Sequence, residues 1–193
     1  MDNSLACQEE LWEELIDGTV VAMSPRPRFN HNRIAFNIAK IFDRYLAGRS
    51  CTAIADGVDL YLTEKDRFVP DVMVVCDRDK IHWDGVYGAP DLVVEVLSPR
   101  TARYDRRHKK EVYESCGVKE YWIVDPANRT IEQYLLQDGV FQLGPVYVSY
   151  PDYALHTLTE EERGSLVTHF QCSLYDDLDI SLDEIFSGLV PNP

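Results

Sequence analysis

Two strongly apolar segments stand out in the pattern of hydrophobic and polar positions along this chain. Residues 69–76 and 91–97 are runs rich in valine and leucine with few breaks, which is typical of strands buried on both faces in the middle of a sheet. Between residues 30 and 49 the apolar side chains recur every three or four positions, which predicts an amphipathic helix with Asn30 as its N-cap. Alternating strands and helices predict an α/β fold with a central mixed β-sheet flanked by helices.

Shorter elements fill the rest of the chain. A helix is predicted over residues 9–16 and another over residues 104–115, where Gly117 supplies the left-handed conformation that often ends a helix. A polar turn at residues 63–67 predicts a hairpin-like bend, and a loop is expected between the two apolar runs. Further strands are predicted at 18–23, 51–56, 58–62, 120–125, 130–136, 140–148 and near 166–170, a turn at 25–27, and a short helix at 181–186.

The composition fits one globular domain. The chain has 193 residues, of which 45% are hydrophobic, and it contains no repeat or low-complexity linker, so a single domain over residues 1–193 is expected. No run approaches the roughly 18 apolar residues of a membrane span, and residues 1–10 lack a secretory pattern, so a cytoplasmic protein without a membrane partner is expected. The five cysteines are scattered, without a Cys-x-x-Cys pair, which favours reduced thiols.

The charge of the chain argues against a polyanionic partner. With 33 acidic and 19 basic residues, the net charge of −14 repels nucleic acid at long range. The distribution is uneven, however, because residues 100–110 hold six basic side chains and one acid, Asp105. This basic segment is either a solvated helix face or a local site for phosphate.

A glutamate in the second apolar run is the first candidate for chemistry. An unpaired charge in an apolar interior is prohibitive, so Glu95 must be protonated, be paired or bind a cation. Asp71 stands at the start of the other apolar run and offers the same chemistry. Two such acids suggest a divalent-metal site.

A lysine on the helix at 104–115 is the third candidate. In the nuclease pattern PD-(D/E)XK, an Asp ends one strand, an acid lies on the next, and a lysine two residues further supports the attacking water. Pro70-Asp71 and Glu95 match the first two parts, but Leu97 stands where the lysine belongs. Lys109 falls on the helix stripe that should face the sheet, where it either orients water or phosphate or makes a purely structural salt bridge with Glu95.

Several longer segments carry a resemblance to a known family. They are Glu14-Leu15-Ile16-Asp17-Gly18, Met23-Ser24-Pro25 followed by His31, Arg67-Phe68-Val69-Pro70-Asp71-Val72, residues 90–99, and the block that runs from Asp105, Lys109 and Tyr113 through residues 117–126. On these segments, which span most of the chain, the sequence resembles the Uma-type family of endonucleases with the restriction-endonuclease-like PD-(D/E)XK fold. The resemblance implies that Asp71 and Glu95 bind Mg²⁺ or Mn²⁺, with the Val96 carbonyl as a third ligand, and that Lys109 replaces the lysine missing at position 97.

Three further side chains keep two interpretations each. His31 could contact phosphate or metal-bound water, or could lie on the surface at the helix start. Glu14 could be an additional acid of the site or an exposed helical glutamate. Asp105 could orient Lys109 or serve only as a favourable acid near a helix start. The pair Tyr121-Trp122 is expected to pack in the core and not to stack on nucleobases.

These observations support two kinds of function. The first is a metal-dependent endonuclease that hydrolyses DNA, or RNA or another phosphodiester, with catalytic residues Asp71, Glu95, Lys109 and His31. The second is a non-catalytic nucleic-acid-binding or regulatory module in which Asp71, Glu95 and Lys109 form a buried ion-pair network, as the acidic charge and Leu97 favour. A homodimer through the apolar strands at 130–148 is a further hypothesis.

Overall fold

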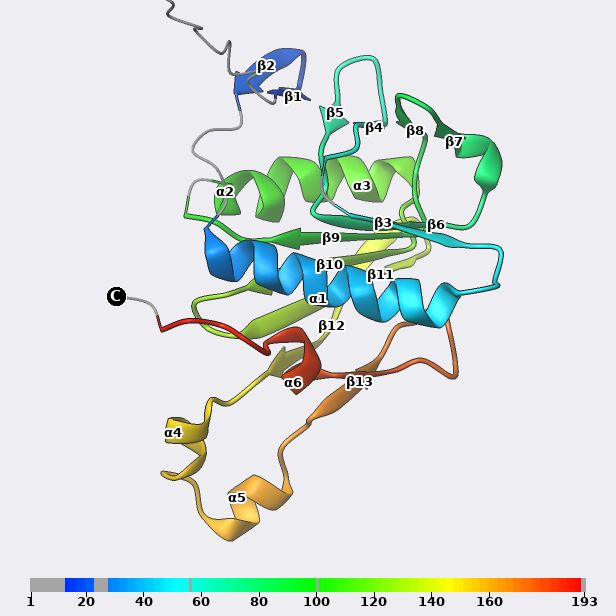
Figure 1. Ribbon diagram of the computed structural model, residues 1–193. Coiled ribbons are helices and arrows are strands. Elements are labelled where there is room, and N and C mark those ends of the chain that lie inside the picture. Colours follow the sequence, from blue (N-terminus) through cyan, green and yellow to red (C-terminus); the bar gives the residue numbers. More distant parts are fainter. Residues whose placement is uncertain (1–12, 23–27, 56, 100, 192–193) are drawn as a thin grey trace, which may run out of the picture.

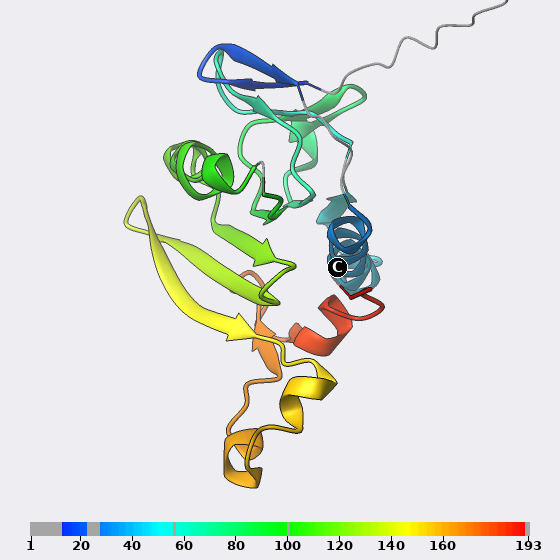
Figure 2. The same ribbon diagram turned by 90° about the vertical axis from the view of Figure 1, so that its left-hand side faces the viewer.

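Three β-sheets organise the part of the chain that the structure describes. The computed structural model describes residues 13–22, 28–55, 57–99 and 101–191 (Figure 1). Within these segments, two sheets have six strands each and a third is a pair of strands. One six-stranded sheet is the centre of the molecule, and the other lies beyond one of the helices that cover it (Figure 2).

The central sheet is mixed and carries helices on both faces. Its strand order is β12-β11-β10-β9-β6-β3, in which β9 and β10 are parallel and all other neighbours are antiparallel. Helix α1 (Phe29–Leu46) covers one face, and a continuous helix formed by residues 102–116 covers the other (Figures 1 and 2). The expected mixed sheet flanked by helices is therefore confirmed. The strands are β3 (Thr52–Ala55), β6 (Val72–Val75), β9 (Leu92–Val96), β10 (Glu120–Asp125), β11 (Thr130–Gln137) and β12 (Val140–Val148).

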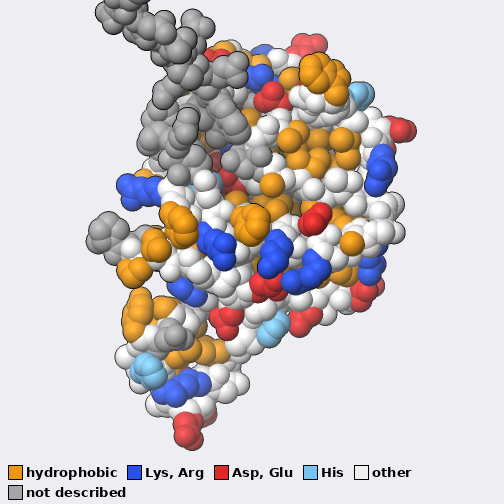
Figure 3. Space-filling model, viewed as in Figure 1, with side chains coloured by type: hydrophobic (Ala, Val, Ile, Leu, Met, Phe, Trp, Pro, Cys, Tyr) orange, Lys and Arg blue, Asp and Glu red, His pale blue; other side chains and the backbone are white. Residues whose placement is uncertain are grey.

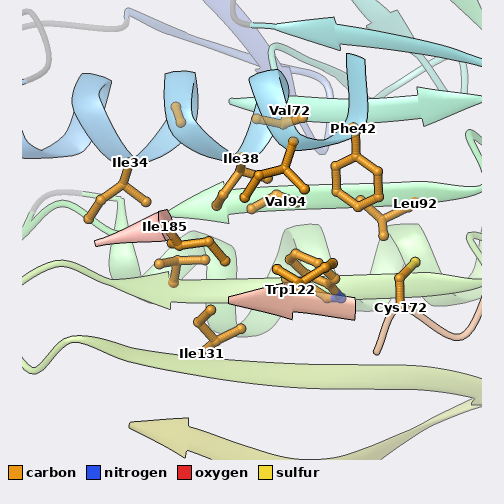
Figure 4. Packing of buried hydrophobic residues seen from close by; sticks show 14 of the residues in the cluster. Ile34, Ile38, Phe42, Val72, Leu92, Val94, Trp122, Ile131, Cys172 and Ile185 are labelled. Atoms are coloured by element: carbon orange, nitrogen blue, oxygen red, sulfur yellow. The ribbon is translucent and has the colours of Figure 1, made fainter. Parts of the chain in front are cut away.

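Each strand of this sheet contributes to two separate cores. Val94 and Val96 of β9 pack toward α1, whereas Val93 and Leu97 belong to the cluster on the opposite face. Figure 4 shows the α1 side, where Val94 and Trp122 lie among side chains of the helix. Tyr121 is fully buried on the other face, so the prediction that the aromatic pair is core is confirmed. Burial on both faces explains why the runs contain so few polar residues.

The second six-stranded sheet was not expected from the sequence. Its strand order is β2-β1-β5-β4-β8-β7, and it packs over the helix of residues 102–116 (Figure 2). The predicted helix over residues 9–16 is wrong, because Glu13–Ile16 form a strand; residues 9–12 and the predicted turn at 25–27 lie outside the described residues. The predicted loop between the apolar runs contains a 3-10 turn, η1 (Arg78–Lys80), and two strands. The strands are β1 (Glu13–Ile16), β2 (Thr19–Ala22), β4 (Leu60–Tyr61), β5 (Arg67–Phe68), β7 (Ile81–His82) and β8 (Gly85–Tyr87).

The chain's last segment closes against the start of α1. The expected capping role of Asn30 is wrong, since the helix begins one residue earlier and Arg28 occupies the N-cap without a side-chain bond. The Asn30 amide instead pairs with the backbone of Val190, donating to its carbonyl at 2.8 Å and accepting from its N–H at 2.9 Å. The elements that lead there are α4 (Asp152–Leu155), α5 (Glu160–Gly164), β13 (His169–Gln171), β14 (Asp179–Ser181) and α6 (Leu182–Ile185).

Two cysteines form a disulfide, which corrects the expectation of reduced thiols. Cys51 and Cys76 are bonded, while Cys116 and Cys172 are free. The register between β3 and β6 pairs Thr52 with Val75, so the next residues outward on the two strands face each other. The spacing of 25 residues gave no hint of this pair, because the strand pairing that joins them is long-range.

No helix in the described segments combines the length and the apolar character needed to cross a membrane.

Candidate active site

Asp71 and Glu95 meet on the face of the central sheet that lies under the helix of residues 102–116. Strands β6 and β9 pair Val72 with Val94, so continuing the antiparallel register by one step places Asp71 opposite Glu95 on one face. Both side chains are buried, with residue exposures of 8% and 3%. The carboxylate of Asp71 also accepts a hydrogen bond from the Val96 N–H at 2.7 Å. The structure therefore brings together the two acids that the sequence singled out.

Lys109 enters the same site from the helix. Its Nζ lies 2.8 Å from Glu14 Oε1, 3.1 Å from Glu95 Oε1 and 3.5 Å from Asp105 Oδ1. The helix comprises α2 (Ala102–Tyr104), the π-helical segment η2 (Asp105–Lys109) and α3 (Lys110–Cys116), and Gly117 ends it with a φ of 89° as predicted. The π-helical segment has Asp105 and Lys109 as its buried residues, and such segments recur at functional sites.

Glu14 belongs to the site, which corrects the interpretation of an exposed helical residue. It sits on β1 of the second sheet and is only 3% exposed. Its Oε1 accepts a hydrogen bond from the Val69 N–H at 3.0 Å and also contacts the Lys109 ammonium. The site therefore lies where the second sheet, the helix and the central sheet meet. In the sequence, Glu14 stands between Glu13 and Leu15 and gave no signal of burial, which depends on a sheet that the pattern did not predict.

His31 approaches the site from the opposite side. It lies in the first turn of α1, and its Nε2 is 3.4 Å from Asp71 Oδ2. The exposed fraction of its side chain is 12%, so the alternative of a surface histidine at a helix start is wrong. All four residues proposed from sequence as catalytic are thus neighbours in space.

Negative charge dominates this buried cluster. Burial raises the pKa of Glu95 well above its usual value; Lys109 opposes the shift, and the nearby carboxylates reinforce it. Burial likewise raises the pKa of Asp105. Burial alone would lower the pKa of Lys109, but the surrounding carboxylates, Glu95 foremost, hold that pKa well above its usual value. The lysine therefore stays an ammonium, while Glu95 and Asp105 tend to keep their protons.

Tyr113 is a member of the site whose contact the sequence did not indicate. Its hydroxyl donates to Glu95 Oε1 at 2.7 Å, and burial together with the Glu95 carboxylate raises the pKa of the phenol well above its usual value. The residue lies one helical turn beyond Lys109, so both donors address the same carboxylate oxygen. The helical spacing of Lys109 and Tyr113 could have signalled this pairing.

The carboxylate oxygens of Asp71 and Glu95 that have no hydrogen-bond partner in the described part of the chain could bind a cation. Among the described residues, Asp71 Oδ1 and Glu95 Oε2 have no hydrogen-bond partner, whereas Asp71 Oδ2 and Glu95 Oε1 each have at least one. The N–H and C=O of a strand residue point to the same side, so the Val96 carbonyl points toward Asp71 like its N–H. Two carboxylate oxygens and a carbonyl suit a hard cation that keeps several waters. No cluster of three or more His, Cys, Asp and Glu side chains in the described segments has a metal-binding arrangement.

The described part of the basic segment, residues 101–110, does not form one cationic face. Lys109 is buried, Arg106 is paired with Glu132, and Lys110 lies 4.7 Å from the centre of the Tyr134 ring. Arg103 and Arg107 are exposed. Both interpretations of this segment therefore hold in part: Lys109 belongs to the site, and the exposed basic residues form a solvated helix face.

A mixed sheet that brings two acids on neighbouring strands together with a buried lysine defines a protein of the restriction-endonuclease-like class. The chain belongs to the Uma2 family, described as "Putative restriction endonuclease", whose model matches residues 5–166. It is similar to a crystal structure of "a putative nuclease belonging to DUF820" from Anabaena variabilis, with a TM-score of 0.63 and 20% identity over 91% of this chain and 89% of that one.

Two relatives from Synechocystis sp. (strain ATCC 27184 / PCC 6803 / Kazusa) also match. Uncharacterized protein sll1609 is 27% identical over 63% of this chain, which spans 70% of that protein. Uncharacterized protein slr1290 is 31% identical over 65% of this chain, which spans 66% of that protein.

Proposed function

We propose that this protein is a divalent-metal-dependent endonuclease that hydrolyses phosphodiester bonds of DNA. Asp71, Glu95 and the Val96 carbonyl would hold Mg²⁺ or Mn²⁺. The observation that carries the proposal is the shared face of the two carboxylates, each with one oxygen that has no partner in the described segments. The family's description as a restriction endonuclease supports DNA as the substrate, with RNA or another phosphodiester as the alternatives to be tested.

Lys109 acts on the reacting atoms in this proposal. A bound divalent ion would supply Lewis-acid chemistry that activates water and offsets phosphate charge. The Lys109 ammonium, whose pKa is raised by the carboxylates around it, keeps its proton at neutral pH and can orient the attacking water or a phosphate oxygen. It thereby takes the role of the lysine that Leu97 cannot fill.

Neighbouring groups position these atoms. Glu14 and Asp105 hold the Lys109 ammonium between them, at 2.8 and 3.5 Å. Tyr113 fixes the Glu95 carboxylate through its hydroxyl. His31, within 3.4 Å of Asp71, can hold that carboxylate or donate to phosphate. Buried donors and acceptors of this kind restrict the rotamers of the reacting groups.

Cleavage of plasmid DNA by Glu95→Gln tests the proposal. We expect Mg²⁺- or Mn²⁺-dependent cleavage by the wild-type protein and a loss of more than about 100-fold in the variant, because removing a metal ligand costs more than removing an outer partner. Asp91→Asn is the matched control, since Asp91 precedes the same strand but contacts Lys119 and the Cys76 N–H, away from the site. Cleavage that survives in Glu95→Gln would overturn the proposal.

A non-catalytic module is the second candidate, and one observation favours it. Lys109 contacts three carboxylates by itself, as expected of a purely structural ion-pair network. The two functions differ in their response to Mg²⁺. A metal-binding site gains about 2.7 kcal/mol of stability when the free ion is at 100 times its Kd, whereas a network that is neutralised by Lys109 shows no thermal shift.

A homodimer is part of the proposal as well. Strand β12 is an edge of the central sheet, and its Val140, Leu143 and Val146 side chains are about half exposed, at 50%, 52% and 50%. An edge strand with apolar side chains favours association with another chain. Sedimentation velocity of the wild-type protein and of Leu143→Glu tests this, and a wild-type monomer would refute it.

A further inference from the structure

The exposed face of α1 carries aromatic and basic side chains in one row. Phe29, Arg33, Phe36 and Lys40 follow each other at spacings of four, three and four residues, so they share one side of the helix. Figure 3, in the view of Figure 1, shows hydrophobic and basic side chains gathered along this helix. We call these four residues the α1 row.

The two phenylalanines are unusually exposed. Phe29 is 59% and Phe36 58% accessible, although the opposite face of the same helix packs into the central core. Arg33 lies beside Phe36, with its guanidinium carbon 5.9 Å from the ring centre, and its buried Nε has no hydrogen-bond partner in the described segments. The row therefore presents two flat apolar surfaces with a partly buried cation between them.

The charges around the row favour an anion. Arg28 adds an exposed cation at the start of the helix, and Lys40 forms no ion pair among the described residues. The acids nearby are Asp43, which is exposed, and Glu184, which already pairs with Arg44 at 2.9 Å. On a chain of net charge −14, a cationic strip of this kind is a local exception.

The row begins at the candidate active site. His31, two residues after Phe29, projects to the inner side of the helix and lies 3.4 Å from Asp71. The rise of an α-helix, about 1.5 Å per residue, separates Phe29 from Phe36 by about 10 Å along the axis. That distance equals about three nucleotide steps of 3.4 Å, so a strand leaving the site could place every third base near a ring.

We propose that the α1 row binds a single strand of nucleic acid next to the cleavage site. Bases stack on Phe29 and Phe36, and phosphates contact Arg33 and Lys40. This inference rests on the proposed nuclease function and adds to it the form of the substrate. A single strand fits better than a duplex, because the bases of a duplex are paired and stacked and have no free face for an exposed phenyl ring.

Fluorescence anisotropy with a labelled 20-nucleotide oligo-dT tests the row. The wild-type protein is measured in EDTA, so that binding is read without cleavage, against oligo-dT, oligo-U and a duplex of equal length. We expect Phe36→Ala and Phe29→Ala each to weaken oligo-dT binding by about 5- to 150-fold, the range for loss of one stacked base. Equal losses with oligo-U would show that the row binds both DNA and RNA. A loss confined to oligo-dT would show that it binds DNA.

The salt dependence separates the two parts of the row. Lys40→Gln should reduce the slope of log affinity against log salt by about 0.7, the value for one phosphate contact on a single strand, whereas Phe36→Ala should leave the slope unchanged. Tyr153→Ala is the aromatic control, because Tyr153 is 79% exposed on α4 and outside the row. Lys65→Gln is the basic control at an exposed turn.

Four outcomes would overturn this inference. The first two are no measurable binding of oligo-dT, and an unchanged affinity in Phe36→Ala with an unchanged melting temperature. The other two are an equal loss of affinity in Tyr153→Ala, and tighter binding of the duplex that neither Phe29→Ala nor Phe36→Ala weakens. A change in oligomeric state in Phe36→Ala without a change in affinity would assign the row to protein contact instead. Binding that depends on Phe36, without any cleavage, would contradict the proposed nuclease function but would still support the α1 row as a binding site for a single strand.

Discussion

The two faces of the central sheet each bury a glutamate, and they treat it differently. On the α1 face, Glu120 is 0% exposed, and both of its oxygens are occupied by neutral donors: Trp122 Nε1 and Gln133 Nε2 on one oxygen, and Ser173 on the other. On the opposite face, Glu95 receives Lys109 and Tyr113 on a single oxygen. The first carboxylate is saturated and structural. The second has one oxygen without a partner in the described segments, so the occupancy of the second oxygen, and not burial, distinguishes the two acids.

The largest effect is expected from removing the cation of the second face. Lys109→Met leaves the carboxylates of Glu14, Glu95 and Asp105 buried without compensation, and breaking a buried ion pair from one side costs about 3–5 kcal/mol. Urea unfolding at pH 7 measures the loss. Lys110→Met, one residue further on and over the Tyr134 ring, should cost under about 1 kcal/mol. Equal losses in the two variants would show that Lys109 does not hold the cluster together.

Exchanging each glutamate for glutamine tests the comparison most directly. Glu120→Gln sets an amide N–H₂ against donors that need an acceptor, and should lower the free energy of unfolding by about 2–3 kcal/mol. Glu95→Gln should be close to neutral or stabilising in metal-free buffer, because the amide removes repulsion with the neighbouring acids. Thermal melts of both variants with and without Mg²⁺ read this out. A strong destabilisation of metal-free Glu95→Gln would mean that Glu95 is as structural as Glu120.

Only some residues of the candidate site could be predicted from the sequence. The acids Asp71 and Glu95 were visible because each interrupts or begins an apolar run, and the antiparallel register of β6 and β9 then places them together. Lys109 was visible from helical spacing. Glu14 was placed on a predicted helix, because its burial depends on β1 pairing with β5, a strand of two residues that is too short to show a period.

Some elements of the fold could likewise be predicted from the sequence, and others could not. Long elements with buried faces, such as α1 and β9, were predicted because hydrophobic periodicity reports burial directly. The second sheet and the Cys51–Cys76 bond were not predicted, since both arise from contacts between segments far apart in the sequence. The π-helical segment at Asp105–Lys109 leaves no mark in a hydrophobic pattern, because its spacing differs from that of an α-helix by less than one residue per turn.

A smaller effect sharpens the comparison through single hydroxyls. At a pH above the raised pKa of Glu95, Tyr113→Phe removes a hydrogen bond to a carboxylate and should cost about 1.5–3 kcal/mol, the range for bonds to charged groups. Tyr147→Phe is the matched control on the other face, where the hydroxyl donates to the neutral Gln133 Oε1 at 3.2 Å, and it should cost about 0.5–1.5 kcal/mol. Urea unfolding of both variants at one pH decides. A cost for Tyr113→Phe at or below that of Tyr147→Phe would imply that Glu95 is protonated at that pH.

The smallest effect is a slope of stability with pH, and it belongs to one face only. Because burial raises the pKa of Glu95 above its ordinary 4.5, the folded state holds a proton that the unfolded state releases. The stabilisation is complete below pH 4.5 and is lost as the pH rises through the raised pKa, at up to about 1.4 kcal/mol per pH unit. Metal-free wild-type protein should therefore lose stability more steeply than Glu95→Gln as the pH rises above 4.5.

The other face supplies the control for this slope. Ile38→Ala weakens the α1 core by about 2–5 kcal/mol at every pH and should keep the wild-type slope, since it touches no titrating group of the site. Mg²⁺ at saturating concentration should flatten or reverse the slope of the wild-type protein, because a cation favours the deprotonated acids. Chemical denaturation across the pH series, with and without Mg²⁺, measures all three. Identical slopes for wild-type and Glu95→Gln would show that Glu95 is ionised throughout and that Lys109 alone compensates it.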